Sequence, residues 1–421
     1  MRMKKILVVM GTYLPRPSAN GICLKGIIDI LKEQGDEVIV LTSNLHNYPF
    51  YEEIDNTKIY RIKDKFIYTD KFNSKNVFFK KIFKLIDKIS SLFKLLVYYN
   101  VSLTRKRRYT LKADELMKEY KFDMVISVVR PAETLYVLKF LKKNYPEIKT
   151  VSYNLDILND INISKFINPL YQVKTIRFYR RISLYIDAII NLNYSKEYFL
   201  SSFYKNLHNK MYFVDIPTFH QIKSEYEIKD WKDNTINIVF TGMLSETIRN
   251  PETILKCFFY LRDIDFVLHF YSRGCEDILN EVKKQLGNKI ELHGFVPTEV
   301  SYAAIKKADY LLNISNKTNY QVPSKIFEYF ASGKPLINYI YSDNDPAMKY
   351  YNQYDNRIDI CSGNNIEQES KKLRMFLFNK RKKSMTYKEL EEIYYENTPK
   401  CLVDILNNCL KEEKMEQNYN E

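Results

Sequence analysis

Short apolar runs alternate with amphipathic segments along most of the chain. Lys4 to Met10 is a continuous apolar run, and a helix predicted over Ile22 to Gln34 separates it from a strand predicted over Glu37 to Thr42. Continuous apolar runs are typical of parallel strands that are buried on both faces of a sheet. The chain therefore begins with a predicted strand–helix–strand unit of an α/β sheet.

The same alternation occurs in two series. The first series adds expected strands at Met124 to Val129, Thr150 to Leu155, Ala188 to Asn193 and Met211 to Ile216. The second has expected strands at Ile236 to Phe240, Phe266 to Tyr271, Ile290 to Leu292, Asp309 to Ile314, Lys334 to Ile340 and Ile358 to Cys361. Residues 217–234 are polar, charged and aperiodic, which is typical of a linker. The pattern predicts an α/β protein with two doubly wound, Rossmann-like domains, 1–216 and 235–393, and a helical segment at 394–421.

Residues 60–108 interrupt the alternation, and there Lys and Arg outnumber Asp and Glu by roughly five to one. Within this insertion, one predicted helical face is apolar and the other basic, with Phe78 and Ile82 among the apolar positions and Lys80, Lys81 and Lys84 among the basic ones. Such a helix is typical of a membrane surface, where Arg105, Arg107 and Arg108 would meet lipid phosphates. An ordinary surface helix with a solvated basic side is the alternative interpretation.

The stretch Asn319 to Ile337 combines the features of a short helix with polar groups at its start. Pro323 stands at the first turn, and Gly333 follows the last. Free N–H groups at Ser324 and Lys325, together with the positive end of the helix dipole, suit a diphosphate. Glu328, one turn further, is placed to accept hydrogen bonds from a sugar hydroxyl. A core helix capped by its own serine is the alternative.

Composition limits the class of partner. The 421 residues are 45% hydrophobic and 28% charged, as in a globular protein of two domains. A formal net charge of +14 predicts attraction to nucleic acid, an anionic membrane or phosphorylated small molecules. No apolar run reaches the ~20 residues of a membrane-spanning helix. The short apolar run at the N-terminus is interpreted as a strand and not as a signal peptide.

The sequence offers little for metal or nucleophilic chemistry. Its six cysteines lack Cys-x-x-Cys spacing, and His220, His269 and His293 show no ligand spacing. Asp343 to Asp345 has the Asp-x-Asp form of a metal–diphosphate motif but precedes Pro346 at a turn, so we interpret it as structural. Neither a Gly-x-Ser-x-Gly elbow nor a Walker loop occurs. The sequence therefore predicts no metal and no cofactor.

Several stretches resemble the family-4 retaining glycosyltransferases of the GT-B fold, in particular the bacterial surface-polysaccharide (capsule and O-antigen) branch. They are YLPRPSANGICLKGIIDILKEQGDEVIVLT, FTGMLSETIRNPETIL, IELHGFVPTEVSYAAIKKADYLLNIS and QVPSKIFEYFASGKPLI. The resemblance covers nearly the whole chain apart from the basic insertion. It implies two Rossmann-like domains that face each other across a cleft, with a final helix that crosses back to the N-terminal domain.

The resemblance also implies roles for particular residues. Glu328 would bind the ribose of a nucleotide-sugar, and Arg249 would neutralise its diphosphate. Asp156 would contact the donor sugar or the acceptor, and Arg249 and Asp156 are the two expected catalytic residues. The implied donor-binding set is Gly21, Gly242, Arg249, Gly294, Phe295, Val296, Tyr320, Pro323, Ser324, Lys325 and Glu328. Tyr320 stands where the family's Glu-x7-Glu pattern has its first glutamate, so the sequence leaves the donor sugar open.

Together these features predict a retaining hexosyltransferase of bacterial surface polysaccharide synthesis. It would transfer a sugar from a nucleotide donor, expected to be UDP-linked, to a polyprenyl-diphosphate-linked or oligosaccharide acceptor. We expect it to lie in the cytoplasm, peripherally at the inner face of the plasma membrane. One alternative is a GT-B-like sugar-nucleotide epimerase, and another is a non-catalytic protein that binds anionic membranes or nucleic acid. Signals for nucleic-acid-binding folds are missing, and the basic charge lies beside an apolar helix face, which favours the membrane.

Overall fold

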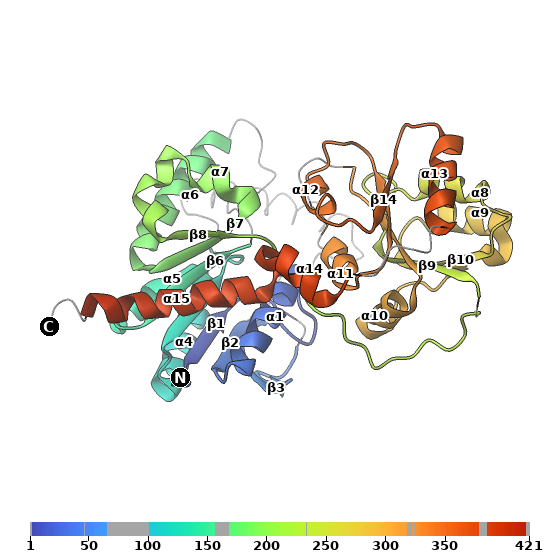
Figure 1. Ribbon diagram of the computed structural model, residues 1–421. Helices are drawn as coiled ribbons and strands as arrows, with labels where there is room; N and C mark the ends of the chain where they lie inside the picture. The colour runs from blue at the N-terminus through green and yellow to red at the C-terminus, as the bar shows by residue number, and fades with distance from the viewer. Residues whose placement is uncertain are drawn as a thin grey trace, which may run out of the picture. The chain divides into compact units, whose positions relative to one another are not determined.

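The chain forms two compact units in the computed structural model, which describes residues 2–45, 47–64, 101–155, 168–232, 234–317, 322–323, 325–378 and 385–417 (Figure 1). Unit 1 comprises Met1–Pro217 and Pro399–Glu421, and unit 2 comprises Thr218–Thr398. Each unit is a sheet covered by helices on both faces, as the alternating pattern predicts.

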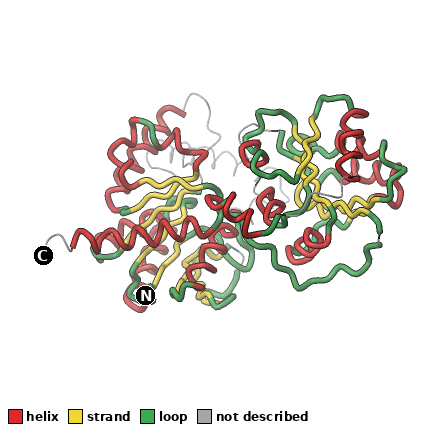
Figure 2. The backbone as a smooth tube through the Cα atoms, viewed as in Figure 1, coloured by secondary structure: helices red, strands yellow, loops and turns green. Residues whose placement is uncertain are grey.

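The sheet of unit 1 has eight strands in the order β3-β4-β2-β1-β5-β6-β7-β8. Figure 2 shows the strands in yellow and the helices in red. The strands are β1 (Lys5–Val9), β2 (Glu37–Asn44), β3 (Tyr51–Ile54), β4 (Thr57–Lys63), β5 (Met124–Val128), β6 (Lys149–Asn154), β7 (Ala188–Leu192) and β8 (Met211–Val214). Neighbouring strands are parallel except for the antiparallel pair β3–β4 at one edge. The order reverses between β1 and β5, as in a doubly wound sheet.

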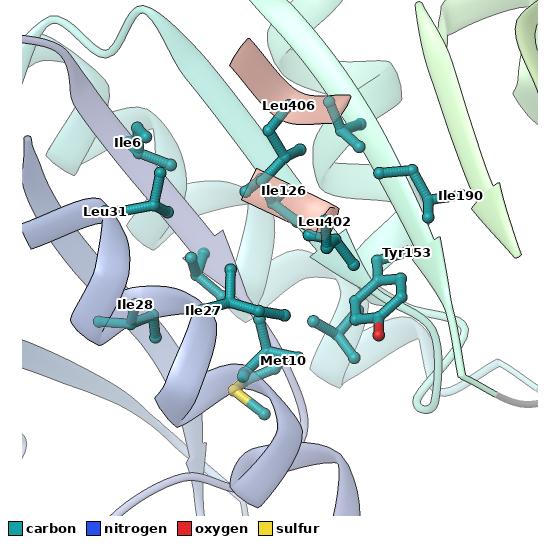
Figure 3. Close-up of a cluster of buried hydrophobic side chains, with 14 of the residues drawn as sticks. Ile6, Met10, Ile27, Ile28, Leu31, Ile126, Tyr153, Ile190, Leu402 and Leu406 are labelled. Carbon is teal, nitrogen blue, oxygen red and sulfur yellow. The ribbon is translucent and has the colours of Figure 1, made fainter. Parts of the chain in front are cut away.

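Helices bury an apolar core on each face of this sheet. They are α1 (Ala19–Glu33), α4 (Leu103–Tyr120), α5 (Thr134–Asn144), α6 (Asn168–Ile182), α7 (Lys196–Phe199) and α15 (Pro399–Gln417). Figure 3 shows one core, where Ile27 of α1 and Leu402 and Leu406 of α15 meet strand residues such as Tyr153. Helices α4, α5 and α6 contribute to the other core. Residues 399–417 are therefore a helix of unit 1, although they follow unit 2 in the sequence.

The two ends of the predicted basic insertion are integral parts of unit 1. Strand β4 extends to Lys63, and α4 begins at Leu103. Tyr109 of α4 is fully buried, and its hydroxyl donates to the carbonyl of Met10 at 2.7 Å. The prediction that residues 60–108 stand apart from the alternation is wrong at both ends, because these residues pair with β2 and cover the sheet. Residues 65–100 lie outside the described residues.

The sheet of unit 2 has six parallel strands in the order β11-β10-β9-β12-β13-β14. They are β9 (Ile236–Met243), β10 (Phe266–Arg273), β11 (Ile290–Leu292), β12 (Tyr310–Ile314), β13 (Leu336–Ile340) and β14 (Arg357–Cys361). Its helices are α8 (Glu252–Phe259), α9 (Glu276–Leu286), α10 (Thr298–Lys307), α11 (Lys325–Ala331), α12 (Met348–Tyr351), α13 (Ile366–Phe378) and α14 (Tyr387–Ile393). The reversal of strand order falls between β9 and β12.

The predicted linker belongs to unit 2. Residues 218–232 have no regular secondary structure, but Phe219 is fully buried and stacks on Tyr387 at a centroid distance of 5.4 Å. Trp231 is 8% exposed and stacks on His269 at 4.2 Å. Burial of these two aromatic rings stabilises the segment against unit 2, so it does not act as a solvated linker.

In the part of the chain that the structure describes, none of the helices combines the length and the apolar character needed to cross a bilayer.

Candidate functional site

Strands β9 and β12 separate at the point where the strand order of unit 2 reverses. Their ladder registers Tyr310 with Ile238 and Leu311 with Val239, and β9 then continues to Met243. Beyond the ladder, the hydroxyl of Tyr329 on α11 accepts from the amide of Thr241 at 2.8 Å and lies 3.2 Å from its carbonyl oxygen. Open α/β sheets bind ligands at such switch points. Tyr329 therefore anchors α11 at the expected place for a ligand.

Arg249 lies in the loop that follows β9. Its backbone forms two hydrogen bonds with Ser245, of 3.1 and 2.7 Å, which close the loop on itself. The guanidinium Nε and Nη2 donate to Oδ1 of Asn316 at 3.2 and 2.8 Å, and Nη1 donates to the carbonyl of Met243 at 3.3 Å. Gly242 adopts φ of +135°, and a Cβ there would lie 3.8 Å from Nη1. These contacts hold the guanidinium at the carboxyl end of β9.

The acceptors around this guanidinium are neutral. Burial lowers the pKa of Arg249, while neighbouring tyrosines, Tyr329 first, act in the opposite direction. An arginine nevertheless keeps its charge in proteins. Over the described ranges of the chain, the ion pairs of unit 2 engage other cations, and no carboxylate pairs with Arg249. A half-buried cation that pairs with no carboxylate is suited to an anionic ligand, because charge-assisted hydrogen bonds are stronger than those between neutral groups.

Helix α11 carries both a core face and a polar pair. Five of its seven residues are buried, namely Ile326, Phe327, Tyr329, Phe330 and Ala331. The other two form an ion pair, with Lys325 Nζ 2.5 Å from Glu328 Oε2 and side chains that are 25% and 18% exposed. The core interpretation of this helix and the site interpretation thus describe different faces of the same seven residues. The carboxylate predicted to bind a ribose accepts a hydrogen bond from Lys325 in this structure.

A cavity of about 460 Å³ opens at the carboxyl ends of β10 and β11. Gly294 and Phe295 line it, and Phe295 is 82% exposed. The other lining residues are Phe270, Ser272, Arg273, Gly274, Glu276, Leu279, Asn280 and Leu292. Val296 is partly buried and packs instead against the core on the α10–α11 side. The cavity combines apolar walls with polar groups, as small-molecule sites commonly do.

Other predicted residues have structural roles or lie outside the described residues. Gly21 follows Ser18, the N-cap of α1, and a Cβ on Gly21 would come within 2.9 Å of the Thr12 carbonyl oxygen, so close packing requires glycine there. Pro323 is buried just before α11. Asp156, Tyr320 and Ser324 lie outside the described residues, as do Phe78, Lys80, Lys81, Ile82 and Lys84. Their predicted roles stay predictions.

The basic run at the start of α4 is largely engaged within unit 1. Nε of Arg105 lies 2.8 Å from Oδ2 of Asp64, and Nη1 lies 3.4 Å from Oε1 of Glu133. Arg108 donates to the carbonyl of Lys63, whereas Arg107 is exposed. Two carboxylates already pair with Arg105, and its predicted contact with lipid phosphates stays a prediction.

Sequence reasoning missed Asn316 and Tyr329 as parts of this arrangement. Asn316 follows β12, and the position of a polar residue just past a strand end was the available signal. Tyr329 lies among the apolar residues of α11, where an aromatic residue is expected to belong to the core. Its second function, as a hydrogen-bonding link to β9, depends on a contact with a residue 88 positions away.

The two-unit α/β fold is shared with solved structures of sugar-processing enzymes. A glycosyltransferase from Rickettsia africae is 16% identical, with a TM-score of 0.58 over 98% of this chain and 99% of that chain. The N-terminal domain of trehalose-6-phosphate phosphatase from Candida albicans is 13% identical, with a TM-score of 0.55 over 97% of both chains. UDP-GlcNAc 2-epimerase from Methanocaldococcus jannaschii is 13% identical, with a TM-score of 0.50 over 96% and 99%.

At these identities the likeness defines the fold, which is the GT-B fold with two Rossmann-like units. No protein-family model and no protein of curated function matches the chain. The class of reaction therefore depends on the residues of the site.

Proposed function

We propose that the protein is a retaining glycosyltransferase that uses a nucleotide-sugar donor, which we expect to be UDP-linked. The observation that carries this proposal is Arg249, a half-buried cation at the switch point of unit 2 whose acceptors are the neutral groups of Asn316 and Met243. A nucleoside diphosphate would supply the missing negative charge. The GT-B fold of the Rickettsia africae glycosyltransferase supports the same class.

Each part of the site has a proposed role. Arg249 would stabilise the charge that develops on the leaving nucleoside diphosphate. Glu328 would exchange its hydrogen bond from Lys325 for one from a ribose hydroxyl, which frees the ammonium of Lys325 for a phosphate oxygen. Gly294 and Phe295, which line the cavity beside β11, would receive the base. Asp156, Gly21 and Tyr320 stay proposals from the family resemblance, as contacts to the donor sugar or the acceptor.

The acceptor and the cellular place are proposed from the sequence. We propose a polyprenyl-diphosphate-linked or oligosaccharide acceptor in bacterial surface polysaccharide synthesis, handled at the inner face of the plasma membrane. The basic character of residues 60–108 supports peripheral binding to anionic lipid, with Arg107 exposed at the start of α4. Salt-sensitive co-sedimentation with anionic vesicles, lost on deletion of residues 77–100, would be the expected behaviour; binding unchanged by the deletion would exclude that segment.

A sugar-nucleotide epimerase is the second candidate, because the Methanocaldococcus jannaschii epimerase shares the fold. The two functions differ in their need for an acceptor. An epimerase acts on the nucleotide-sugar alone, whereas a transferase requires an acceptor for productive sugar transfer. NMR spectroscopy of the sugar products, with and without a lipid-linked acceptor, separates them, because epimers have the same mass but different spectra. An altered sugar formed without acceptor would refute the transferase.

The donor site is tested by calorimetric titration of UDP and GDP into the wild-type protein and the variants Arg249→Ala and Glu328→Ala. A hydrogen bond to a charged group contributes about 1.5–3 kcal/mol, so Arg249→Ala should weaken binding by roughly 10- to 150-fold. Arg374→Ala is the matched control, since Arg374 pairs with Asp263 at the surface of the same unit. Equal affinities for wild type and Arg249→Ala would show that the donor site is elsewhere.

A further inference from the structure

Three metal-binding side chains meet on one face of the unit 2 sheet. His269 on β10 is in register with Glu291 on β11, and His293 follows Glu291 by two residues. Nδ1 of His269 lies 3.1 Å from Nε2 of His293 and 3.4 Å from Oε2 of Glu291. Nε2 of His293 lies 3.6 Å from the same carboxylate oxygen. The three atoms therefore form a nearly equilateral triangle.

The size of this triangle matches one face of a tetrahedral zinc site. Zinc binds nitrogen and oxygen at about 2.0–2.2 Å, so two ligands of a tetrahedron lie ~3.3–3.6 Å apart. The three observed separations of 3.1, 3.4 and 3.6 Å bracket that range. An ion about 2.0–2.2 Å from each of the three atoms would fit these separations with small side-chain adjustments. Glu291 is 51% exposed, so solvent can reach the cluster.

Asn237 holds His269 in the tautomer that a metal requires. Nε2 of His269 lies 3.0 Å from Oδ1 of Asn237, while Nδ2 of Asn237 donates to the carbonyl of Thr235 at 2.9 Å. That second bond identifies the amide oxygen as the atom facing His269, so Nε2 carries the proton and Nδ1 presents its lone pair. Ligating histidines commonly donate their other ring N–H to such an acceptor.

Aromatic neighbours fix both imidazole planes. His269 stacks on Trp231 at a centroid distance of 4.2 Å and an interplanar angle of 18°. His293 stacks on Tyr271 at 4.1 Å and 6°. Because the rings are held in place before any ion arrives, binding costs little side-chain entropy.

We propose that His269, Glu291 and His293 form a binding site for one divalent transition-metal ion of the zinc class, with solvent as the fourth ligand. Two imidazoles and one carboxylate favour such an ion over Mg²⁺ or Ca²⁺, which take oxygen ligands. The ion would cross-link β10 and β11 immediately before Gly294 and Phe295, and so brace the turn that lines the 460 Å³ cavity. The proposed ion lies outside the contacts of Arg249, so this site does not depend on the proposed transferase function.

The test uses the full-length protein, freed of metal by chelation and titrated with Zn²⁺ in a calorimeter and with Co²⁺ in a spectrophotometer. Wild type should bind one equivalent of Zn²⁺, give the visible absorption of tetrahedral Co²⁺, and show quenching of Trp231 by Co²⁺. Glu291→Gln and His293→Ala should each weaken Zn²⁺ binding by more than the roughly 10- to 100-fold that is typical when a residue supporting a metal ligand is replaced. Both residues are partly exposed, so the variants should fold.

His220→Gln is the matched control, because His220 lies in the same unit and bonds to Thr218 and Tyr302 outside the cluster. It should bind Zn²⁺ as wild type does. Absence of stoichiometric Zn²⁺ binding would overturn the proposal and leave the two histidines as a hydrogen-bonded pair. Zn²⁺ binding that Glu291→Gln and His293→Ala leave unchanged would place the ion elsewhere and equally overturn it. Neither result bears on nucleotide affinity, which tests the transferase separately.

Discussion

Replacement of Tyr329 by phenylalanine tests whether α11 is held to β9 at the switch point. Burial raises the pKa of Tyr329 to about 12, so the hydroxyl keeps its proton and can donate to the Thr241 carbonyl while it accepts from the Thr241 amide. The substitution removes one oxygen atom and leaves the ring in place, so the cavity created is small. Its main effect is to leave two buried backbone groups without their partner.

An unsatisfied buried polar group costs about 1–3 kcal/mol. The total destabilisation from the amide and carbonyl of Thr241 should be smaller than twice this value, because the carbonyl can relax. We therefore expect Tyr329→Phe to reduce the free energy of unfolding of unit 2 by ~2–3 kcal/mol. The chain has a single tryptophan, Trp231, and it is buried in unit 2, so its fluorescence during urea denaturation reports on that unit. The midpoint should fall while the slope stays unchanged.

Tyr260→Phe serves as the control, because Tyr260 is 54% exposed in the same unit. It should change stability by less than about 0.5 kcal/mol. If Tyr329→Phe changes the Trp231 transition no more than Tyr260→Phe does, the Tyr329 hydroxyl does not stabilise the contact between α11 and β9.

Two further predictions use the same Trp231 transition. Gly333→Ala should destabilise unit 2 by about 1–3 kcal/mol more than Gly287→Ala. Both glycines have positive φ, but a Cβ at Gly333 would lie 2.3 Å from a backbone carbonyl oxygen, whereas none of the described atoms lies within 4 Å of a Cβ at Gly287. Equal destabilisation by the two substitutions would exclude the clash. Burial raises the pKa of Asp345 above its usual 3.8, so the folded protein retains a proton that the unfolded chain releases, and stability falls as the pH rises through the window above 3.8. Asp345→Asn should remove this dependence and stabilise unit 2 at neutral pH, and a pH profile identical to wild type would contradict the assignment.

The sequence by itself determined most strands of both units and the polar residues that follow them. Apolar runs such as Lys5–Val9 and Leu336–Ile340 are buried on both faces, so their composition alone distinguishes them. It also placed Arg249 after β9 and Gly294 after β11, whereas Gly242 lies within β9, which extends to Met243. Strands β3 and β4 were missed because β3 is an exposed edge strand and β4 mixes apolar residues with Lys58 and Arg61, so neither contains a continuous apolar run.

Only the tertiary structure decided which of these residues meet. Composition marks residues 217–234 as a linker, but Phe219 and Trp231 pack against apolar residues of unit 2, and their burial outweighs the polar character of their neighbours. His269 and Glu291 are 22 positions apart and carry no ligand spacing, yet strand register places them side by side. Sequence patterns report local periodicity, whereas the partners of a side chain depend on strand order and register, and at this site those two features bring the polar groups together.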